Sequence, residues 1–289
     1  MFVKPRFKSP PMTAAEMRAF MVAYIEPRAR PLEGVSVSED EFAGLPARWV
    51  EPPGAADGAL LIYLHGGAFV VETPNAHSAF LTHLTNACEI RAVMPSYRLA
   101  PEHPYPAAVD DCLGVYKAVL EQGYDPRKIV LAGDSAGGNL ALVTLQQARD
   151  LALPLPACAV MVSPGLDLSG TKSQTENATK DPMFNEHVVS HVVAHYLQGD
   201  FGLTSDPRVS PLKGSFQDLP PLFFIAGSTE IFRDCSIYSA HKAKQAGVDA
   251  TCHIWSGMPH CFPIMFQGLL PEAGQALKDM VEFIHSHSA

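Results

Sequence analysis

Several absences narrow the classes of protein to which this 289-residue sequence can belong. It contains no run of about eighteen apolar residues, the length that a membrane-spanning helix requires. Its N-terminal segment is polar and rich in proline, and it lacks the continuous apolar stretch of a signal peptide. We therefore expect a cytoplasmic protein that forms no stable association with a membrane.

Basic residues are scarce as well. The chain has 21 Lys and Arg against 30 Asp and Glu, which gives a net charge of −9, and its basic residues form no stripe. Nucleic-acid binding depends on clustered basic side chains that neutralise phosphates. The sequence thus argues against a nucleic-acid partner.

Cysteine pairs and metal-binding patterns are also missing. The six cysteines are scattered without a C-x-x-C pair, and we expect free thiols because a chain of this length needs no disulfide staples. His187, His191 and His195 recur every four residues, but the H-E-x-x-H pattern and further ligands are lacking. We expect neither a metal nor an organic cofactor.

What the sequence does contain is a G-x-S-x-G motif at residues 133–137, Gly-Asp-Ser-Ala-Gly. An apolar run at residues 129–132 precedes the motif, and a helical pattern follows it from Asn139. A strand, a sharp glycine-flanked turn and a helix in this order raise a serine hydroxyl to the end of a sheet, at the helix N-terminus. The motif therefore predicts that Ser135 is a catalytic nucleophile.

A second glycine-rich segment, His-Gly-Gly-Ala-Phe at residues 65–69, follows the apolar strand pattern of residues 60–64. A serine nucleophile needs preorganised N–H groups that stabilise the charge developing on the carbonyl oxygen of the substrate. Small residues let the backbone approach that oxygen. We predict that the oxyanion donors are the N–H groups of Gly66, Gly67 and Ala136, the residue after the nucleophile.

The sequence contains twelve histidines, and we choose the general base among them by its position in the chain. When the serine lies on such a turn, the triad follows the order Ser, acid, His, with the last two on loops after late strands. Residues 251–255 predict a late strand that contains His253. The Gly- and Pro-containing loop after it presents His260, which we predict to be the base.

Two carboxylates are candidates for the acid that orients the base. The strand pattern of residues 221–227 ends shortly before Glu230, where a carboxylate can reach an imidazole N–H and stabilise the imidazolium. Asp234 lies one helical turn further on, where it fits a charge near a helix N-terminus or a partner of Arg233. We favour Glu230 and keep Asp234 as the alternative.

The remaining patterns alternate between strands and helices. This alternation indicates an α/β fold with a mostly parallel central sheet and helices on both of its faces. After two opening antiparallel strands at 35–42 and 47–51, the expected strands are residues 60–64, 92–95, 129–132, 158–162, 222–226 and 251–255. The expected helices are residues 78–88, 107–122, 139–149, 237–246 and 275–286.

In combination, these motifs resemble the bacterial hormone-sensitive-lipase branch of the α/β hydrolases. That branch carries H-G-G-G, Y-R-L-A-P-E-H-P-x-P-A and G-D-S-A-G-G-N, which correspond here to residues 65–68, 97–107 and 133–139. The resemblance implies the α/β-hydrolase fold and esterase activity. Two positions depart from it, because the third glycine is Ala68 and the catalytic aspartate of the D-x-L-R-D pattern is Glu230.

The resemblance also implies a helical cap on a single α/β-hydrolase domain of residues 1–289. Two segments fall outside the strand–helix alternation, at about residues 1–34 and 171–210, with expected helices at 13–25 and 185–197. Equivalent segments form the cap in the family. Some apolar cap residues are expected to face the pocket or to pack the cap against the core: Met12, Met17, Phe20, Met21, Met183 and Phe184.

The expected function is that of a carboxylesterase whose partner is a small-molecule ester with a short- to medium-chain acyl group. Amide or lactone hydrolysis would use the same triad, and a non-catalytic hydrolase-fold receptor for small molecules is the rival from another class. Retention of Ser135 and His260 disfavours the receptor. Because relatives often associate through the outer edge of the sheet, a homodimer is a further expectation.

Overall fold

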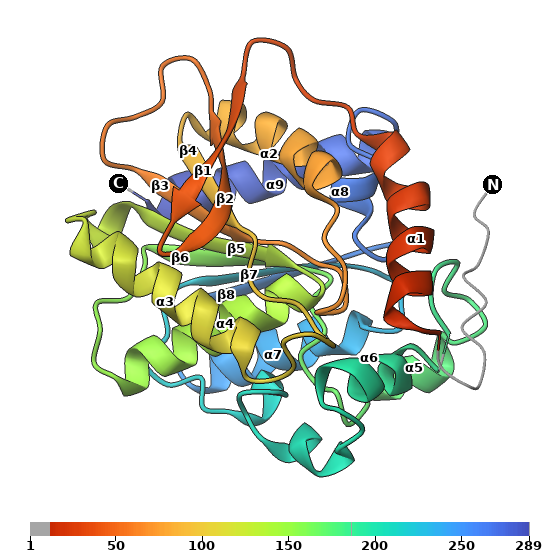
Figure 1. The fold of residues 1–289 in the computed structure, drawn as a ribbon. Coiled ribbons are helices and arrows are strands. Elements are labelled where there is room, and N and C mark those ends of the chain that lie inside the picture. The colour runs from red at the N-terminus through yellow and green to blue at the C-terminus, as the bar shows by residue number, and fades with distance from the viewer. Residues whose placement is uncertain (1–11, 186, 289) are drawn as a thin grey trace.

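The computed structural model describes residues 12–185 and 187–288, which are arranged around a twisted sheet (Figure 1). In these residues the sheet has eight strands in the order β1-β2-β4-β3-β5-β6-β7-β8. β2 is antiparallel to β1 and β4, and the other neighbouring strands are parallel, so the predicted fold class is confirmed. The strands are β1 (Ser36–Phe42), β2 (Leu45–Glu51), β3 (Leu60–Leu64), β4 (Arg91–Pro95), β5 (Ile129–Asp134), β6 (Cys158–Val162), β7 (Leu222–Gly227) and β8 (Ala250–Trp255).

Helices cover both faces of this sheet (Figure 1). They are α1 (Ala14–Ile25), α2 (Pro74–Cys88), α3 (Ala107–Glu121), α4 (Ala136–Asp150), α5 (Lys172–Glu176), α6 (Val188–Tyr196), α7 (Arg233–Gln245), α8 (Phe262–Met265) and α9 (Pro271–His287). Leu60 and Ile62 of β3 belong to one apolar core cluster with residues of α3, α4 and α7. Leu61 and Tyr63 point to the opposite face and pack with α2, α8 and α9. The central strands are therefore apolar on both faces, as a parallel sheet between two helical layers requires.

Three helices begin about one turn earlier than the sequence patterns indicate. α2 begins at Pro74 and α9 at Pro271, and proline fits this first helical position because its missing N–H would have no partner there. α7 begins at Arg233, close behind Glu230. Apolar periodicity does not mark these first turns, since polar residues and proline predominate in them.

The N-terminal helix α1 lies beside the insertion between β6 and β7, at the right of Figure 1. Thr13 and Glu16 start this helix with a capping box, in which each side chain accepts a hydrogen bond from the backbone N–H of the other. His195 of α6 is hydrogen bonded to the carbonyl oxygen of Met12 (2.7 Å). The two segments that the sequence sets apart from the strand–helix alternation thus meet in space.

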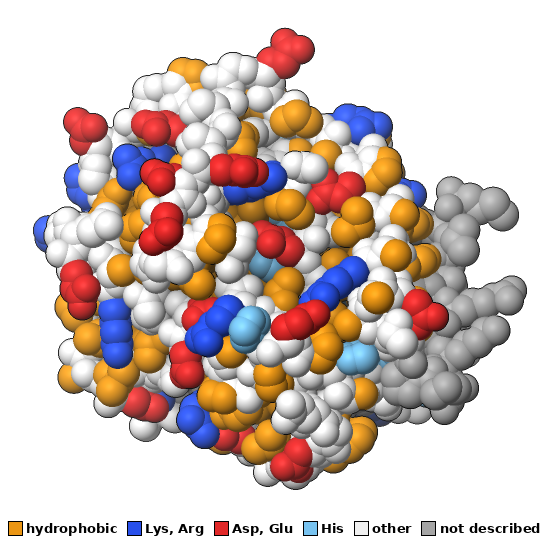
Figure 2. All heavy atoms as spheres, viewed as in Figure 1, with side chains coloured by type: hydrophobic (Ala, Val, Ile, Leu, Met, Phe, Trp, Pro, Cys, Tyr) orange, Lys and Arg blue, Asp and Glu red, His pale blue; other side chains and the backbone are white. Residues whose placement is uncertain are grey.

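The surface carries charges of both signs. On the face seen in Figure 2, Lys and Arg side chains are interspersed with Asp and Glu. Some of these charges are paired, as in Arg18–Glu102 (2.6 Å) and Arg98–Asp111 (2.7 Å). Within the described part of the chain, no helix combines the length and the apolar character needed to cross a membrane.

Candidate active site

The chain turns sharply at Ser135, between β5 and α4. The backbone of Ser135 has φ +52° and ψ −116°, a left-handed conformation that costs a residue with a side chain about 1–3 kcal/mol. Its N–H donates to the carbonyl of Val162 in β6 (2.9 Å). A Cβ on Gly137 would collide with the carbonyl of Leu64 in β3, so only glycine lets α4 approach the sheet this closely. The strand–turn–helix predicted around the serine is present.

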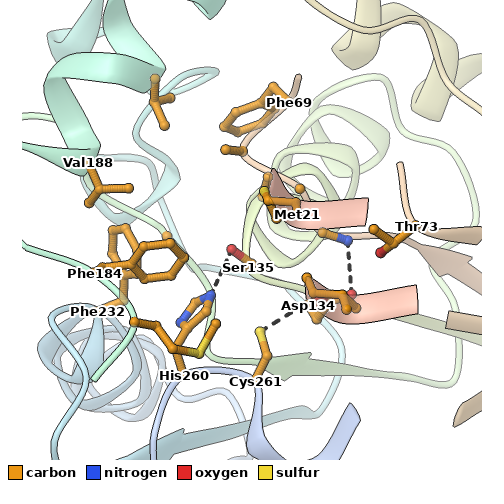
Figure 3. A pocket seen from close by; sticks show the side chains of 18 of the residues that line it. Met21, Phe69, Thr73, Asp134, Ser135, Phe184, Val188, Phe232, His260 and Cys261 are labelled. Atoms are coloured by element: carbon orange, nitrogen blue, oxygen red, sulfur yellow. Dashed lines mark hydrogen bonds between the residues drawn. The ribbon is translucent and has the colours of Figure 1, made fainter. Parts of the chain in front are cut away.

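Two hydrogen bonds connect Ser135 to a histidine and a carboxylate. Ser135 Oγ lies 3.0 Å from His260 Nε2, and a dashed line in Figure 3 marks this hydrogen bond. His260 Nδ1 lies 2.6 Å from Glu230 Oε2. Both His260 and Glu230 are buried. Because a carboxylate oxygen accepts hydrogen bonds, Nδ1 donates to Glu230, and in the neutral form of the ring Nε2 accepts from the serine hydroxyl. This arrangement allows His260 to take the serine proton while Glu230 stabilises the resulting imidazolium.

Ser163 joins the loop of the acid to the loop of the base. Glu230 Oε1 accepts hydrogen bonds from the Gly227 N–H (2.6 Å) and from the Ser163 hydroxyl (3.0 Å). The Ser163 Oγ in turn accepts from the N–H of Cys261 (2.9 Å), next to the histidine. The sequence motifs did not identify Ser163. Its position directly after β6 is the signal that marks it, since polar residues at the carboxyl ends of parallel strands lie close together.

The insertion between β6 and β7 holds the acid loop from outside the sheet. The Asn177 side chain donates to the carbonyl of Glu230 (2.9 Å), and the Asp181 carboxylate accepts from the Ile231 N–H (2.9 Å). The Ser173 hydroxyl donates to the carbonyl of Ile231 (2.7 Å). All three side chains are buried, and burial raises the pKa of Asp181. No local motif reveals these residues, because their partners lie far along the chain.

The alternative acid, Asp234, faces this insertion. Its carboxylate accepts from the backbone N–H of Ser173 (2.8 Å) and forms an ion pair with Arg233 (2.8 Å). The pairing with Arg233 is one of the two roles considered for it from the sequence. The carboxylate that the structure brings to His260 is that of Glu230.

One of the predicted oxyanion donors is engaged elsewhere. The N–H of Gly66 donates to the buried Asp134 Oδ1 (2.9 Å) and is not available to a substrate oxygen, so this prediction is corrected. The next residues, Gly67 and Ala68, have φ of +128° and +57°. Among the described residues, no group accepts from the N–H of Gly67, Ala68 or Ala136. The amide of Ala68 therefore takes the place of Gly66 among the available donors.

Asp134 lies directly before the nucleophile and is buried beneath this glycine-rich loop. Its Oδ1 also accepts from the hydroxyl of Tyr63 (2.8 Å) and lies 3.3 Å from His77 Nε2. Burial alone would raise the pKa of Asp134. The charge and hydrogen bond of His77 oppose this effect, as do the hydrogen bonds from Tyr63 and Gly66, and together they lower the pKa to about 2. Asp134 is therefore ionised at neutral pH.

The space above Ser135 has mainly apolar walls (Figure 3). Four of the apolar residues considered from the sequence line it, namely Met17, Met21, Met183 and Phe184. The other two lie elsewhere: Met12 packs against the core, and Phe20 stacks on Tyr24 with 5.8 Å between ring centroids. Further walls come from Ile25, Phe69, Leu168, Val188, Val192, Phe232, Ile264 and Met265. These side chains suit uncharged acyl and alcohol groups.

The other histidines considered from the sequence have separate contacts. His191 Nδ1 lies 2.8 Å from the carbonyl of His187, whereas His195 contacts the N-terminal segment. In residues 12–185 and 187–288, no three or more His, Cys, Asp or Glu side chains are placed to hold a metal ion. His253 lies within β8, as predicted, and its Nδ1 contacts Asp279 (2.9 Å).

The fold and the site together define an α/β hydrolase, with Ser, acid and His on the loops after β5, β7 and β8. Residues 61–264 match the protein family described as an alpha/beta hydrolase fold. Over 228 residues, 78% of this chain and 75% of the relative, the sequence is 38% identical to an esterase from Acinetobacter venetianus. Over 244 residues, 83% of this chain and 79% of the relative, it is 35% identical to an acetyl-hydrolase from Streptomyces hygroscopicus.

Solved structures agree with these relatives. The crystal structure of an esterase from the bacterial hormone-sensitive lipase family aligns with a TM-score of 0.90 at 36% identity, over 97% of this chain and 94% of that one. The chain belongs to the bacterial hormone-sensitive lipase family of α/β hydrolases, and it is an ester hydrolase. The family resemblance inferred from the motifs is confirmed.

Proposed function

We propose that this ester hydrolase acts through a covalent acyl-enzyme on Ser135, with His260 as the base and Glu230 as the acid. The observation that carries the proposal is the unbroken pair of hydrogen bonds that runs from Ser135 Oγ through His260 to Glu230. His260 Nε2 takes the serine proton as Oγ attacks the ester carbonyl, and then gives that proton to the leaving alcohol. It next deprotonates a water molecule, which attacks the acyl-enzyme and releases the acid and Ser135.

The oxygen of the tetrahedral intermediate needs N–H donors that no protein group occupies. We assign this role to the amides of Gly67, Ala68 and Ala136, all of which belong to residues that line the cavity around Ser135. Ala136 is the first residue of α4, where N–H groups have no partner within the helix and the helix dipole favours negative charge. At Gly67 any side chain would collide with the carbonyl of Val71, so glycine is required there.

The apolar walls of the cavity favour a particular class of ester. We propose a single α/β-hydrolase domain, residues 1–289, whose cap consists of about residues 1–34 and 171–210 and covers the serine; residues 1–11 of this cap lie outside the described residues. A charged acyl group would lose its hydration in this cavity and find few polar partners. Two relatives are named an acetyl-hydrolase and an ethyl acetate hydrolase, which supports small substrates. Short- to medium-chain acyl esters of small alcohols are the substrates that fit best.

The mechanism is tested by hydrolysis of p-nitrophenyl acetate, butyrate and decanoate with the wild type and with Ser135→Ala. We expect Ser135→Ala to lose at least about 10³-fold in kcat, because the nucleophile and its base act as a unit. Circular dichroism of both proteins checks that the variant is folded. Equal rates for wild type and Ser135→Ala would contradict the acyl-enzyme, and a wild-type preference for amides or lactones in a parallel panel would overturn the substrate class.

We further propose that two copies of the chain associate through an outer edge of the sheet. In the described residues β1 and β8 form the two edges, and edge strands present backbone groups without a sheet partner. Light scattering of the purified protein tests this, since a dimer has twice the 31.2 kDa mass of one chain. A single-chain mass across the accessible concentrations would contradict it.

A further inference from the structure

One oxygen atom beneath the proposed oxyanion loop faces donors from three elements. Asp134 Oδ1 lies 2.8 Å from the hydroxyl of Tyr63, 2.9 Å from the N–H of Gly66 and 3.3 Å from His77 Nε2. Asp134 directly precedes the nucleophile, and Gly66 directly precedes the first proposed oxyanion donor, Gly67. The position of this carboxylate therefore sets how the oxyanion loop lies relative to the nucleophile.

The contacts of His77 favour a proton on both of its ring nitrogens. Nδ1 lies 2.9 Å from the carbonyl oxygen of Thr73 and 3.1 Å from the hydroxyl oxygen of the same residue, and Nε2 faces the carboxylate of Asp134. A neutral imidazole has one N–H, so it would turn a lone pair toward either the carbonyl oxygen or the carboxylate. The imidazolium donates to both.

The burial of His77 and Asp134 also favours the imidazolium form of His77. His77 is 5% exposed and Asp134 is 4% exposed, and in the described residues no Lys or Arg forms an ion pair with Asp134. Neutral donors offset part of the cost of burying the Asp134 carboxylate, and a counter-charge offsets more of it. The imidazolium of His77 supplies that counter-charge from α2.

Among the titratable groups described around Asp134, His77 is the one whose environment favours a positive charge. Burial lowers the pKa of His65, whose ring lies 5.7 Å from that of His77, and Glu72 faces His65 at 4.0 Å. Burial also acts to lower the pKa of His77, but the charge of Asp134 outweighs it and raises the pKa. The remaining groups stay neutral because burial raises their pKa values: Tyr63, Tyr97 and Cys261.

We propose that His77 is a positioning residue that, as an imidazolium, holds Asp134 and through it the Gly66 amide and the oxyanion loop. This inference rests on the proposed function, because it concerns the loop to which we assign the oxyanion donors. His77 forms no hydrogen bond with Ser135 or His260 in the described structure, so it acts through Asp134. Without His77, Asp134 would be a buried charge without a counter-charge, and we expect the loop that it anchors to shift.

The kinetic test compares wild type, His77→Leu and His77→Gln on p-nitrophenyl butyrate. We expect His77→Leu to lower kcat about 10²-fold with KM within about twofold, because a misplacement of about 1 Å has this effect. His77→Gln, which keeps a neutral donor, should lose less. The control is His83→Gln on the same helix, whose Nε2 contacts the carbonyl of Arg30 (2.7 Å), and it should match the wild type.

A second readout separates a displaced oxyanion loop from a generally weakened fold. Each protein is also assayed on the matching thionoester, in which sulfur replaces the carbonyl oxygen and accepts hydrogen bonds poorly. An intact oxyanion hole prefers the oxygen ester, and we expect His77→Leu to reduce this preference about tenfold. A variant that is slowed equally on both esters would overturn the proposal. Partial recovery when Asp134→Asn is added to His77→Gln would support it, since the double variant buries no charge at these two positions.

The charge of His77 can be measured without any activity. In ¹⁵N NMR spectra of histidine side chains, comparison with His77→Gln identifies the His77 signals. We expect both nitrogens to be protonated at about pH 7, with deprotonation and a fall in kcat on the alkaline side, because a raised pKa preserves the ion pair until pH passes that value. A neutral ring at about pH 7 overturns the proposal. If wild type and Ser135→Ala are equally inert while His77 is charged, the proposed esterase mechanism fails and the ion pair stands.

Discussion

Two buried carboxylates flank Ser135, and their counter-charges differ. Glu230 faces His260 at 2.6 Å and accepts its other hydrogen bonds from neutral groups. Asp134 faces His77, which we propose to be an imidazolium in the resting protein. In the proposed mechanism the positive partner of Glu230 arises during the reaction, when His260 takes the serine proton, whereas that of Asp134 is present throughout.

The timing of the counter-charge determines what each carboxylate contributes. Only an interaction that is stronger in the transition state than in the ground state accelerates the chemical step. In the proposed mechanism the contact between Glu230 and His260 strengthens as the imidazolium forms, and we expect it to lower the barrier. The contact between Asp134 and His77 is the same before and during the reaction, so its contribution to the rate is geometric.

The largest effect is expected from Glu230→Gln, which removes the carboxylate that stabilises the imidazolium in the proposed mechanism. The amide can also hold His260 in the wrong tautomer, and we expect kcat on p-nitrophenyl butyrate to fall about 10³–10⁴-fold. Asp234→Asn is the matched control, because Asp234 is also buried in the acid loop region but contacts Ser173 and Arg233. It should retain kcat within about threefold. A crippled Asp234→Asn beside an active Glu230→Gln would reassign the acid.

The grouping of the three proposed catalytic residues in one site was predictable from the sequence, because each of them follows a strongly apolar strand. Ser135, Glu230 and His260 come after β5, β7 and β8, and the carboxyl ends of parallel strands meet at one edge of the sheet. Local sequence therefore carries enough information to bring the three side chains together. The same reasoning identified the strands of the sheet, because central parallel strands are uninterrupted apolar runs.

The rest of the site depends on contacts between distant parts of the chain. Gly66 was predicted as an oxyanion donor from its place in the motif, but its amide is bound by the side chain of Asp134, which the motif does not reveal. Asn177 holds the acid loop from an insertion that has no strand pattern of its own. His77 looks like any polar residue of a helix until Asp134 and Thr73 are placed on either side of it.

Two substitutions that each remove one hydroxyl donor compare the contributions of Glu230 and Asp134 to the rate. Ser163→Ala removes a neutral donor from Glu230, and Tyr63→Phe removes one from Asp134. We expect Ser163→Ala to lower kcat about tenfold, because the proposed mechanism gives Glu230 a part in the transition state, and Tyr63→Phe to lower it less than about threefold. Urea unfolding should show about 1 kcal/mol lost in each variant. A greater loss of kcat in Tyr63→Phe would contradict the division of roles proposed for the two carboxylates.

The smallest effect concerns stability in acid. The pKa of Asp134 is about 2 in the folded protein and about 4 in an unfolded chain, so its stabilising charge is present above pH 4 and is lost as pH falls toward 2. Between about pH 6 and about pH 3 this group should contribute a loss of about 1 kcal/mol in the free energy of unfolding. Urea unfolding at both pH values should show a smaller acid-induced loss for Asp134→Asn than for wild type.

Asp181 provides the control of opposite sign. Burial raises its pKa, so its ionised form opposes folding, and acidification relieves that cost. Asp181→Asn should therefore show a larger acid-induced loss than the wild type, even though it too removes one buried carboxylate. If both variants changed the pH dependence in the same direction, the effect would follow from net charge alone, and the ion pair between Asp134 and His77 would not explain the low pKa of Asp134.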